Sequence, residues 1–263
     1  MDPFWTALAL TVLAGAATVL GGLLAVLGRP LAGRPLAACL GLAAGVMAAV
    51  SVLELLPTAA GNLAETAGPA GVAVALGAGA GGGLLYLILD RLVPSPLQAA
   101  ASQDVDDALR LRRLGLVTAV AIGAHNVPEG FVTFSGTLQD PSLGLAVAVA
   151  MAIHNVPEGV AVAVPGRQAT GSRRRAFAWA AWTGAAEPVG ALACWLLLAP
   201  VLTPALLAGV HAGVAGVMLA LSAHALLPEA RRVGGAPAAL AGTAAGAAVM
   251  ALSLHLMAQA ASV

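Results

Sequence analysis

The sequence predicts an all-α polytopic membrane protein with eight transmembrane helices, and its composition, span lengths and charge placement each support this. Of 263 residues, 60% are hydrophobic and 9% are charged, with a mean hydropathy of +0.93. Soluble domains carry about 25% charged residues. A span needs about 20 apolar residues. We expect spans at roughly 4–27, 36–57, 69–93, 114–138, 142–165, 176–199, 204–228 and 236–260.

The arginines orient these spans. With eight spans, all twelve fall on one side of the membrane: Arg29, Arg34, Arg91, Arg110, Arg112, Arg113, Arg167, Arg173, Arg174, Arg175, Arg231 and Arg232. Basic residues are enriched on the cytoplasmic side, so we expect both termini outside. Residues 94–113 are then a cytoplasmic loop between the third and fourth spans, within one transmembrane transporter domain covering residues 1–263.

An internal repeat relates the second and seventh spans. At a constant separation of 171 residues, Ala44–Met47, Ser51 and Leu55–Pro57 recur as Ala215–Met218, Ser222 and Leu226–Pro228. The two spans cross the membrane in opposite senses, so the repeat is inverted. We therefore expect a 3+2+3 arrangement in which spans 1–3 and 6–8 are inverted repeats around a central pair. Secondary transporters with such repeats bind their substrate near the midplane.

The hexapeptide His-Asn-Val-Pro-Glu-Gly occurs at 125–130 and again at 154–159, in the middle of the fourth and fifth spans. On a helix, residues three or four apart share a face. One helix therefore presents His125, Asn126 and Glu129 to one side, and the next presents His154, Asn155 and Glu158. Pro128 and Pro157 each free a carbonyl of the preceding turn, although a simple kink explains them equally well.

Glu187 adds a third carboxylate in the sixth span. Each acidic residue at the centre of a span costs roughly 2.5–3.5 kcal/mol, and the sequence puts no Arg or Lys in a span core. A bound dication is the expected counter-charge, and a cluster of protonated acids is the alternative. Imidazole, amide and carboxylate ligands suit Zn²⁺, Fe²⁺, Mn²⁺ or Co²⁺. The number of ligands favours two adjacent ions bridged by one glutamate.

Other polar residues in the spans are weaker candidates. Met47 shares a face with Glu54, which lies near the end of the second span, and methionine at such a position is more often core packing. His224 and Glu229 lie at the cytoplasmic end of the seventh span. They either contact the ion as it leaves or form a capping pair at the membrane interface. His211 and His255 stand alone in apolar helices and are expected to be packed imidazoles.

The two His-Asn-x-Pro-Glu-Gly motifs, with Ala186-Glu187-Pro188, resemble the ZIP family of metal-ion transporters, and most closely its bacterial ZupT-like branch. The resemblance covers nearly the whole chain. It implies a binuclear site in the bacterial cytoplasmic membrane, with Glu158 as the bridge and Met47 near one ion. The remaining implied ligands are His125, Asn126, Glu129, His154, Asn155 and Glu187. Asn155 stands where some members have an acid, which puts metal selectivity in doubt.

These observations predict a secondary carrier that imports divalent transition-metal ions, zinc first, with iron, manganese, cobalt or cadmium as others. The expected partners are divalent metal ions and the lipid bilayer, not nucleic acid; a homodimer is left open, and no catalytic cofactor is expected. Two alternatives come from other classes: a proton- or sodium-coupled carrier of organic solutes, and an intramembrane metallohydrolase. The hydrolase would use His-Glu-x-x-His, whereas the spacing here is His-x-x-x-Glu.

Overall fold

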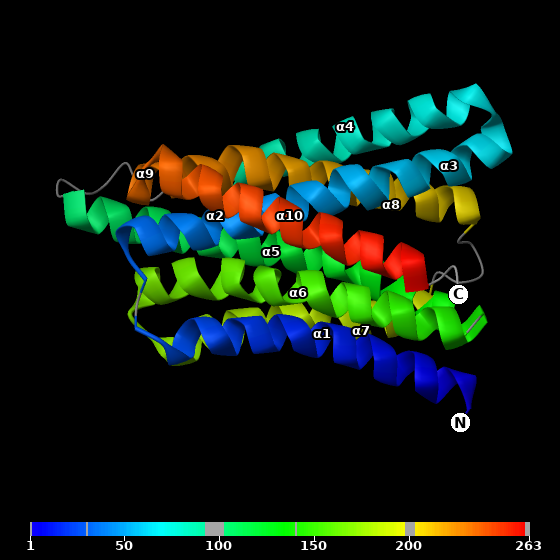
Figure 1. Cartoon of the computed structure of the whole chain (residues 1–263), viewed down its shortest axis with the longest axis horizontal. Coiled ribbons are helices and arrows are strands. Elements are labelled where there is room, and N and C mark those ends of the chain that lie inside the picture. Colours follow the sequence, from blue (N-terminus) through cyan, green and yellow to red (C-terminus); the bar gives the residue numbers. More distant parts are fainter. Residues whose placement is uncertain (1, 30, 93–102, 140, 198–202, 261–263) are drawn as a thin grey trace.

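A computed structural model describes residues 2–29, 31–92, 103–139, 141–197 and 203–260, and within these ranges every regular element is helical (Figure 1). The side chains of some helical residues, His125, Pro128 and His154 among them, lie outside the described part. The elements are α1 (Pro3–Leu27), α2 (Gly33–Val50), η1 (Ser51–Leu55), α3 (Leu56–Ala67), α4 (Pro69–Leu92), α5 (Gln103–Gln139), α6 (Pro141–Thr170), α7 (Arg173–Leu197), α8 (Pro204–Leu221), η3 (Ser222–Leu226), α9 (Leu227–Gly234) and α10 (Ala236–Ala260).

Two of the helices continue beyond the ends that the sequence predicted for their spans. The helix from Gly33 to Ala67 includes η1, and the helix from Pro204 to Gly234 includes η3. Both η1 and η3 are π-helical turns, in which the backbone N–H groups of Leu56 and Leu227 reach back five residues to the carbonyls of Ser51 and Ser222. The wider turn precedes the proline that was expected to end the span, because proline lacks an N–H and disrupts an ordinary α-helical register.

The connection between α4 and α5 is shorter than the predicted loop. Helix α5 begins at Gln103, so residues 103–113 of the expected loop 94–113 are helical. Residues 93–102 lie outside the described ranges. The cytoplasmic placement of this segment remains a prediction.

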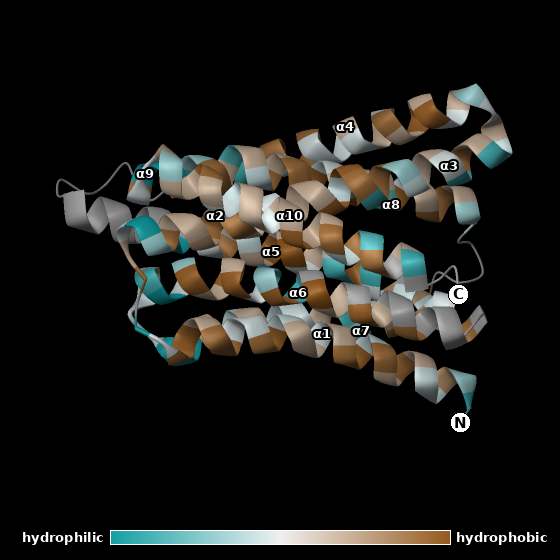
Figure 2. Cartoon of the chain, viewed as in Figure 1, coloured by the Kyte–Doolittle hydropathy of each residue, from teal (hydrophilic) through white to brown (hydrophobic). Residues whose placement is uncertain are grey.

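Five of the described helices are long and apolar enough to cross a membrane: Pro3–Leu27, Gly33–Ala67, Pro69–Arg91, Pro204–Gly234 and Ala236–Leu256. Helices α5, α6 and α7 are as long, but they carry the amides, histidines and carboxylates of the motifs. Large apolar side chains such as Leu24, Leu76 and Leu197 are exposed along the bundle, as expected of a surface that faces lipid. Figure 2 shows hydrophilic residues at the turn between α3 and α4 and around α9, at opposite ends of the molecule.

The helices pack as two related sets. In the first set α2 packs along α10, and α8 packs along α4; in the second, α1 packs along α6, and α7 packs along α5. An inverted repeat that exchanges α1 with α7, α2 with α8, α4 with α10 and α5 with α6 would convert each pair into the other. Figure 1 places the α1–α2 and α6–α7 connections at one end of the bundle, and the start of α1 and the end of α10 at the other.

Contacts between α1 and α7 support the predicted pairing of the first and sixth spans. Gly15–Thr18 reads Gly-Ala-Ala-Thr and Gly184–Glu187 reads Gly-Ala-Ala-Glu, 169 residues apart. A Cβ added to Gly15 would run into the Gly184 carbonyl oxygen, and one added to Gly184 would run into the Gly15 carbonyl oxygen. Each glycine therefore packs on its own repeat-related partner, which is the relationship expected where a pseudo-twofold axis passes between two crossing helices.

Candidate metal centre

The two motif asparagines make equivalent hydrogen bonds to neighbouring helices. Asn126 Nδ2 on α5 donates to the carbonyl oxygen of Thr183 on α7 at 2.9 Å, and Asn155 Nδ2 on α6 donates to that of Ala14 on α1, also at 2.9 Å. Both side chains are fully buried. Thr183 and Ala14 are 169 residues apart, so the bonds obey the same repeat as Gly15 and Gly184. The amides therefore hold the two motifs, residues 125–130 and 154–159 (below called the two half-sites), at equivalent positions along the bundle.

Glu187 on α7 lies close to residues of both motifs. Its Oε2 accepts a second hydrogen bond from Asn155 Nδ2 at 2.7 Å. Its other oxygen, Oε1, is buried and has no hydrogen-bond partner among the described residues. An unsatisfied buried carboxylate oxygen is costly, so this atom is suited to receive a cation.

The three predicted carboxylates are brought together. Glu129, Glu158 and Glu187 come from α5, α6 and α7, and none is more than 2% exposed. Glu187 interacts electrostatically with both Glu129 and Glu158. Buried carboxylates in one low-dielectric region repel strongly when charged, so a cation held by these groups together with further ligands would stabilise them.

His125 and His154 lie on α5 and α6, one residue before the two asparagines, and their side chains fall outside the described part. Among the side chains that are described, no three His, Cys, Asp or Glu groups are close enough to hold a metal ion by themselves. The ligand set expected from the sequence includes these two imidazoles and two amides besides the carboxylates.

The glycine that ends each motif sets how closely the helices approach. A Cβ on Gly130 would run into the backbone carbonyl of Glu187, and one on Gly159 would run into that of Thr18. Small residues allow such close contact between membrane helices. The motif glycines therefore bring α7 against the first motif and α1 against the second.

Met47 is buried on α2 and belongs to the same apolar cluster as Ile122 of α5 and Val162 of α6. Ile122 is one turn before Asn126, and Val162 is one turn after Glu158. Helix α2 also packs against α6, and the role of Met47 as a ligand stays a prediction.

The three pathway candidates are not gathered together. Glu54 is exposed on η1, and the helix continues beyond it to Ala67. His224 Nε2 on η3 lies 3.9 Å from Asp90 Oδ2 on α4. Glu229 on α9 is bound by Arg232, whose Nε lies 3.0 Å from Oε1 and 3.1 Å from Oε2. Both alternatives for His224 and Glu229, an ion-exit contact or an interfacial capping pair, stay predictions.

His211 was expected to be a packed imidazole unrelated to the site. It is partly buried on α8 and interacts electrostatically with Glu129. The sequence offered no signal for this electrostatic interaction, because His211 belongs to no motif and lies 82 residues from Glu129 in the chain.

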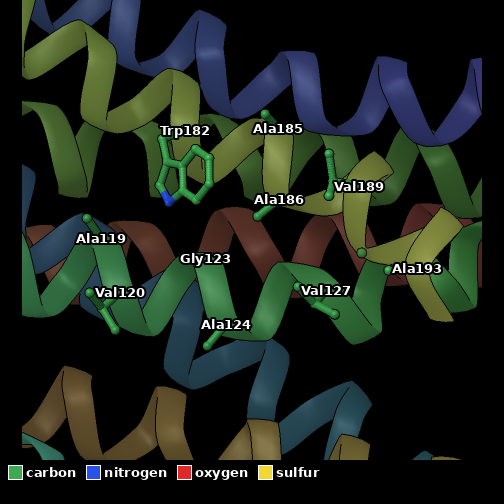
Figure 3. A pocket seen from close by; sticks show the side chains of 11 residues that line it. Ala119, Val120, Gly123, Ala124, Val127, Trp182, Ala185, Ala186, Val189 and Ala193 are labelled. Atoms are coloured by element: carbon green, nitrogen blue, oxygen red, sulfur yellow. The ribbon is translucent and has the colours of Figure 1, made fainter. Parts of the chain in front are cut away.

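The outward side of α5 is apolar. A groove of about 360 Å³ runs between α5 and α7 past Val127, the residue that follows Asn126, and Trp182, Val189 and Ala193 of α7 line it (Figure 3). Its lining offers no carboxylate or imidazole. The motif helix thus turns Asn126 and Glu129 inward and Val127 toward an apolar surface.

Comparisons with known proteins point to one family. A family model described as ZIP Zinc transporter matches residues 95–254. The chain is 47% identical over 258 residues to the zinc transporter ZupT of Corynebacterium glutamicum, covering 95% of this chain and 98% of that protein. It is 42% identical to the zinc transporter ZupT of Streptococcus mutans, covering 96% and 97%, and 45% identical to that of Chlorobium luteolum, covering 98% and 100%.

Proposed function

The chain belongs to the ZIP family of zinc transporters, and from that premise we propose that it carries Zn²⁺ into the cell across a bacterial cytoplasmic membrane. Its relatives are transporters, so the chain is a transporter and not an enzyme, and the intramembrane metallohydrolase is set aside. A carrier of organic solutes loses its support for the same reason.

The observation that carries the proposal is the buried cluster of Glu129, Glu158 and Glu187. Three carboxylates inside a membrane protein would cost several kcal/mol each without a counter-charge. In the described part of the chain, the one buried arginine, Arg167, instead binds carbonyl oxygens at the end of α1. A transported dication supplies the missing positive charge.

We assign the ion ligands to two half-sites. One consists of His125, Asn126 and Glu129, and the other of His154, Asn155 and Glu158, with Glu187 between them. Two ions bridged by Glu158 would use all these groups, and Met47 would add a thioether to one ion. Mixed nitrogen and oxygen ligands suit Zn²⁺, and they also admit Fe²⁺, Mn²⁺, Co²⁺ or Cd²⁺.

The helix pairs support the proposed membrane arrangement. Eight crossings, with both termini outside, would place the arginine-rich connections in the cytoplasm. The transported ion would leave the α5, α6 and α7 ligands when the α2, α4, α8 and α10 set moves against the motif helices. Glu54, His224 and Glu229 are candidate contacts on that path, and a homodimer remains a prediction.

Uptake of radioactive zinc into proteoliposomes tests the function. Wild-type protein should accumulate zinc above protein-free vesicles. Glu158→Ala and His125→Ala should each lower the rate at least about tenfold, because changes even around metal ligands cost 10–100-fold. Competition by unlabelled Fe²⁺, Mn²⁺, Co²⁺ and Cd²⁺ then ranks the other ions.

Two matched controls are available in the same chain. His255 on α10 is exposed, and Glu65 on α3 is exposed, so His255→Ala and Glu65→Ala should keep near-normal uptake. Unchanged uptake in both Glu158→Ala and His125→Ala would overturn the site assignment. Absence of zinc uptake by folded wild-type protein would overturn the function itself.

A further inference from the structure

Thr18 on α1 has a buried hydroxyl that the helix does not use. The side chain is fully buried, and Oγ1 has no hydrogen-bond partner in the described part of the chain. A helical threonine usually donates to the carbonyl one turn earlier. Thr11, Thr137 and Thr243 do so here, at 2.9, 2.6 and 2.9 Å.

The carbonyl oxygen that Thr18 would normally use already accepts a hydrogen bond from a residue of the candidate metal centre. Four residues earlier, the Ala14 carbonyl oxygen accepts the hydrogen bond from Asn155 Nδ2. The Gly15 carbonyl, three residues earlier, packs against Gly184 of α7. The Thr18 hydroxyl is therefore left for something other than its own helix.

By the repeat that relates α1 to α7, Thr18 is the counterpart of Glu187. The match rests on contacts as well as on Gly-Ala-Ala-Thr and Gly-Ala-Ala-Glu. Gly159 packs on the Thr18 carbonyl as Gly130 packs on the Glu187 carbonyl. One turn further on, Gly21 packs on Val156 and Gly190 packs on Val127, in the same position of each motif.

The surroundings of the two side chains match too. Asn155 binds the Ala14 carbonyl of α1 and also Glu187. Asn126 binds the Thr183 carbonyl of α7, and a Cβ on the adjacent Gly184 would lie 3.2 Å from Thr18 Cβ. Asn126 Oδ1 is buried and has no hydrogen-bond partner among the described residues. Thr18 and Asn126 thus lie against the same turn of α7, with one unused polar atom each.

We propose that Thr18 is a further residue of the ion site, whose hydroxyl faces the Asn126 half-site from the position at which Glu187 faces the Asn155 half-site. The hydroxyl is shorter than a carboxylate and uncharged, so it leaves room for a water molecule on the bound ion. The two half-sites therefore differ in charge although their backbones are equivalent. This assignment rests on the proposed zinc transport.

Zinc binding to the purified full-length protein, measured by equilibrium dialysis with Zn²⁺ alone, tests it first. Thr18→Val keeps the shape and removes the hydroxyl, and it should weaken binding about threefold to tenfold, as expected for one hydrogen bond. Thr18→Ser keeps the hydroxyl and should stay within about twofold of wild type. Equal affinity for Thr18→Val and wild type would overturn the assignment.

A carboxylate exchange gives the sharper test, and it does not depend on how well Thr18→Val folds. Glu187→Thr alone should lose most zinc binding. Adding Thr18→Glu to it moves the carboxylate to the repeat-related position, and the double variant should regain at least about tenfold of the lost affinity. A double variant that binds no better than Glu187→Thr would overturn the assignment.

The result separates the two claims. If wild-type protein binds zinc and loses it in Glu187→Thr, while every Thr18 variant behaves like its parent, only the role of Thr18 fails. If the wild type binds no zinc, the proposed function fails and the role of Thr18 fails with it. Thermal unfolding of each variant, compared with wild type, confirms that the compared proteins are folded.

Discussion

Asn155 Nδ2 lies 2.7 Å from Glu187 Oε2 and 2.9 Å from the Ala14 carbonyl oxygen. One amide therefore joins three helices, α6, α1 and α7, and orients the carboxylate that stands between the half-sites. Its repeat-related partner Asn126 makes the equivalent bond to Thr183 of α7. The two asparagines look identical in the sequence, yet one of them is coupled to a buried charge.

Asn155→Asp should make folding depend on zinc. It removes the donor to Glu187 and puts a second carboxylate at hydrogen-bond distance from it, so the metal-free protein should lose more than about 2 kcal/mol of stability. Bound zinc neutralises the pair, so zinc should raise the unfolding temperature more than it does in wild type. Thermal unfolding in detergent, with and without zinc, measures both.

Asn126→Asp is the matched control, because Asn126 donates to a backbone carbonyl and not to a carboxylate. Its metal-free destabilisation should be smaller than that of Asn155→Asp. Equal stabilities for the two metal-free variants would contradict the special position of Asn155.

Glu187→Gln should stabilise the empty protein and weaken its response to zinc. The change removes a buried carboxyl group that lies near Glu129 and Glu158, and it keeps an oxygen that can accept from Asn155. A gain of about 1–2 kcal/mol without metal is expected, at the cost of zinc binding, as is common when a strained functional site is relaxed. Unfolding temperatures across a zinc titration give both quantities.

Glu229→Gln is the comparison for Glu187→Gln, because its expected effects on metal-free stability and on the zinc-induced shift are different. It removes the partner of Arg232, so it should lower stability slightly and leave the zinc-induced shift unchanged. If Glu187→Gln lowered the stability of the metal-free protein as well, repulsion within the carboxylate cluster would not be the dominant effect.

Gly130→Ala should be far more damaging than its chemistry suggests. The added methyl would meet the backbone carbonyl of Glu187, so α5 and α7 must separate, at a cost of about 1–3 kcal/mol for overpacking. Zinc uptake should fall with it, because Glu187 moves away from the half-sites. Gly136 on the same helix has open space around its Cα, so Gly136→Ala should be neutral or stabilising by up to about 1 kcal/mol. Equal effects of the two substitutions on uptake would refute the close approach.

Arg167→Ala should lower stability without lowering zinc affinity. Its Nη1 lies 3.1 Å from the Val26 carbonyl oxygen and 2.6 Å from that of Gly28, and so closes the end of α1. Loss of charged hydrogen bonds worth about 1.5–3 kcal/mol each should lower the unfolding temperature by several degrees. The exposed Arg174 provides the control, and Arg174→Ala should match wild type. A reduced zinc affinity in Arg167→Ala would contradict a purely structural role.

The sequence was informative wherever polar residues interrupted apolar helices. The doubled His-Asn-Val-Pro-Glu-Gly motif and Glu187 are conspicuous in such a chain, and the structure buries Glu129, Glu158 and Glu187 on three neighbouring helices. Their grouping into one ion site stays a prediction. The Leu-Leu-Pro repeat likewise pointed to the equivalence of the helices that contain η1 and η3.

Features that depend on backbone contacts were not predictable in this way. The continuation of the helix through Pro57 needs a π-turn, which has no simple sequence signature. Gly15–Thr18 and Gly184–Glu187 were hidden by the abundance of alanine and glycine, although a direct comparison of α1 with α7 would have revealed them. Arg167 was counted only as a cytoplasmic charge, because its carbonyl partners on α1 are about 140 residues away in the chain.

The turns Ser51–Leu55 and Ser222–Leu226 each hold one residue more than an ordinary helical turn. In a regular α-helix, one extra residue would rotate everything that follows by about 100°. The π-turn absorbs the extra residue because it rotates less per residue, so Ala59 and Leu63 still face α4 and α8. A residue inserted after Leu55, where no π-turn absorbs it, would instead rotate Leu63 away from α4 and disrupt the bundle without touching any ligand.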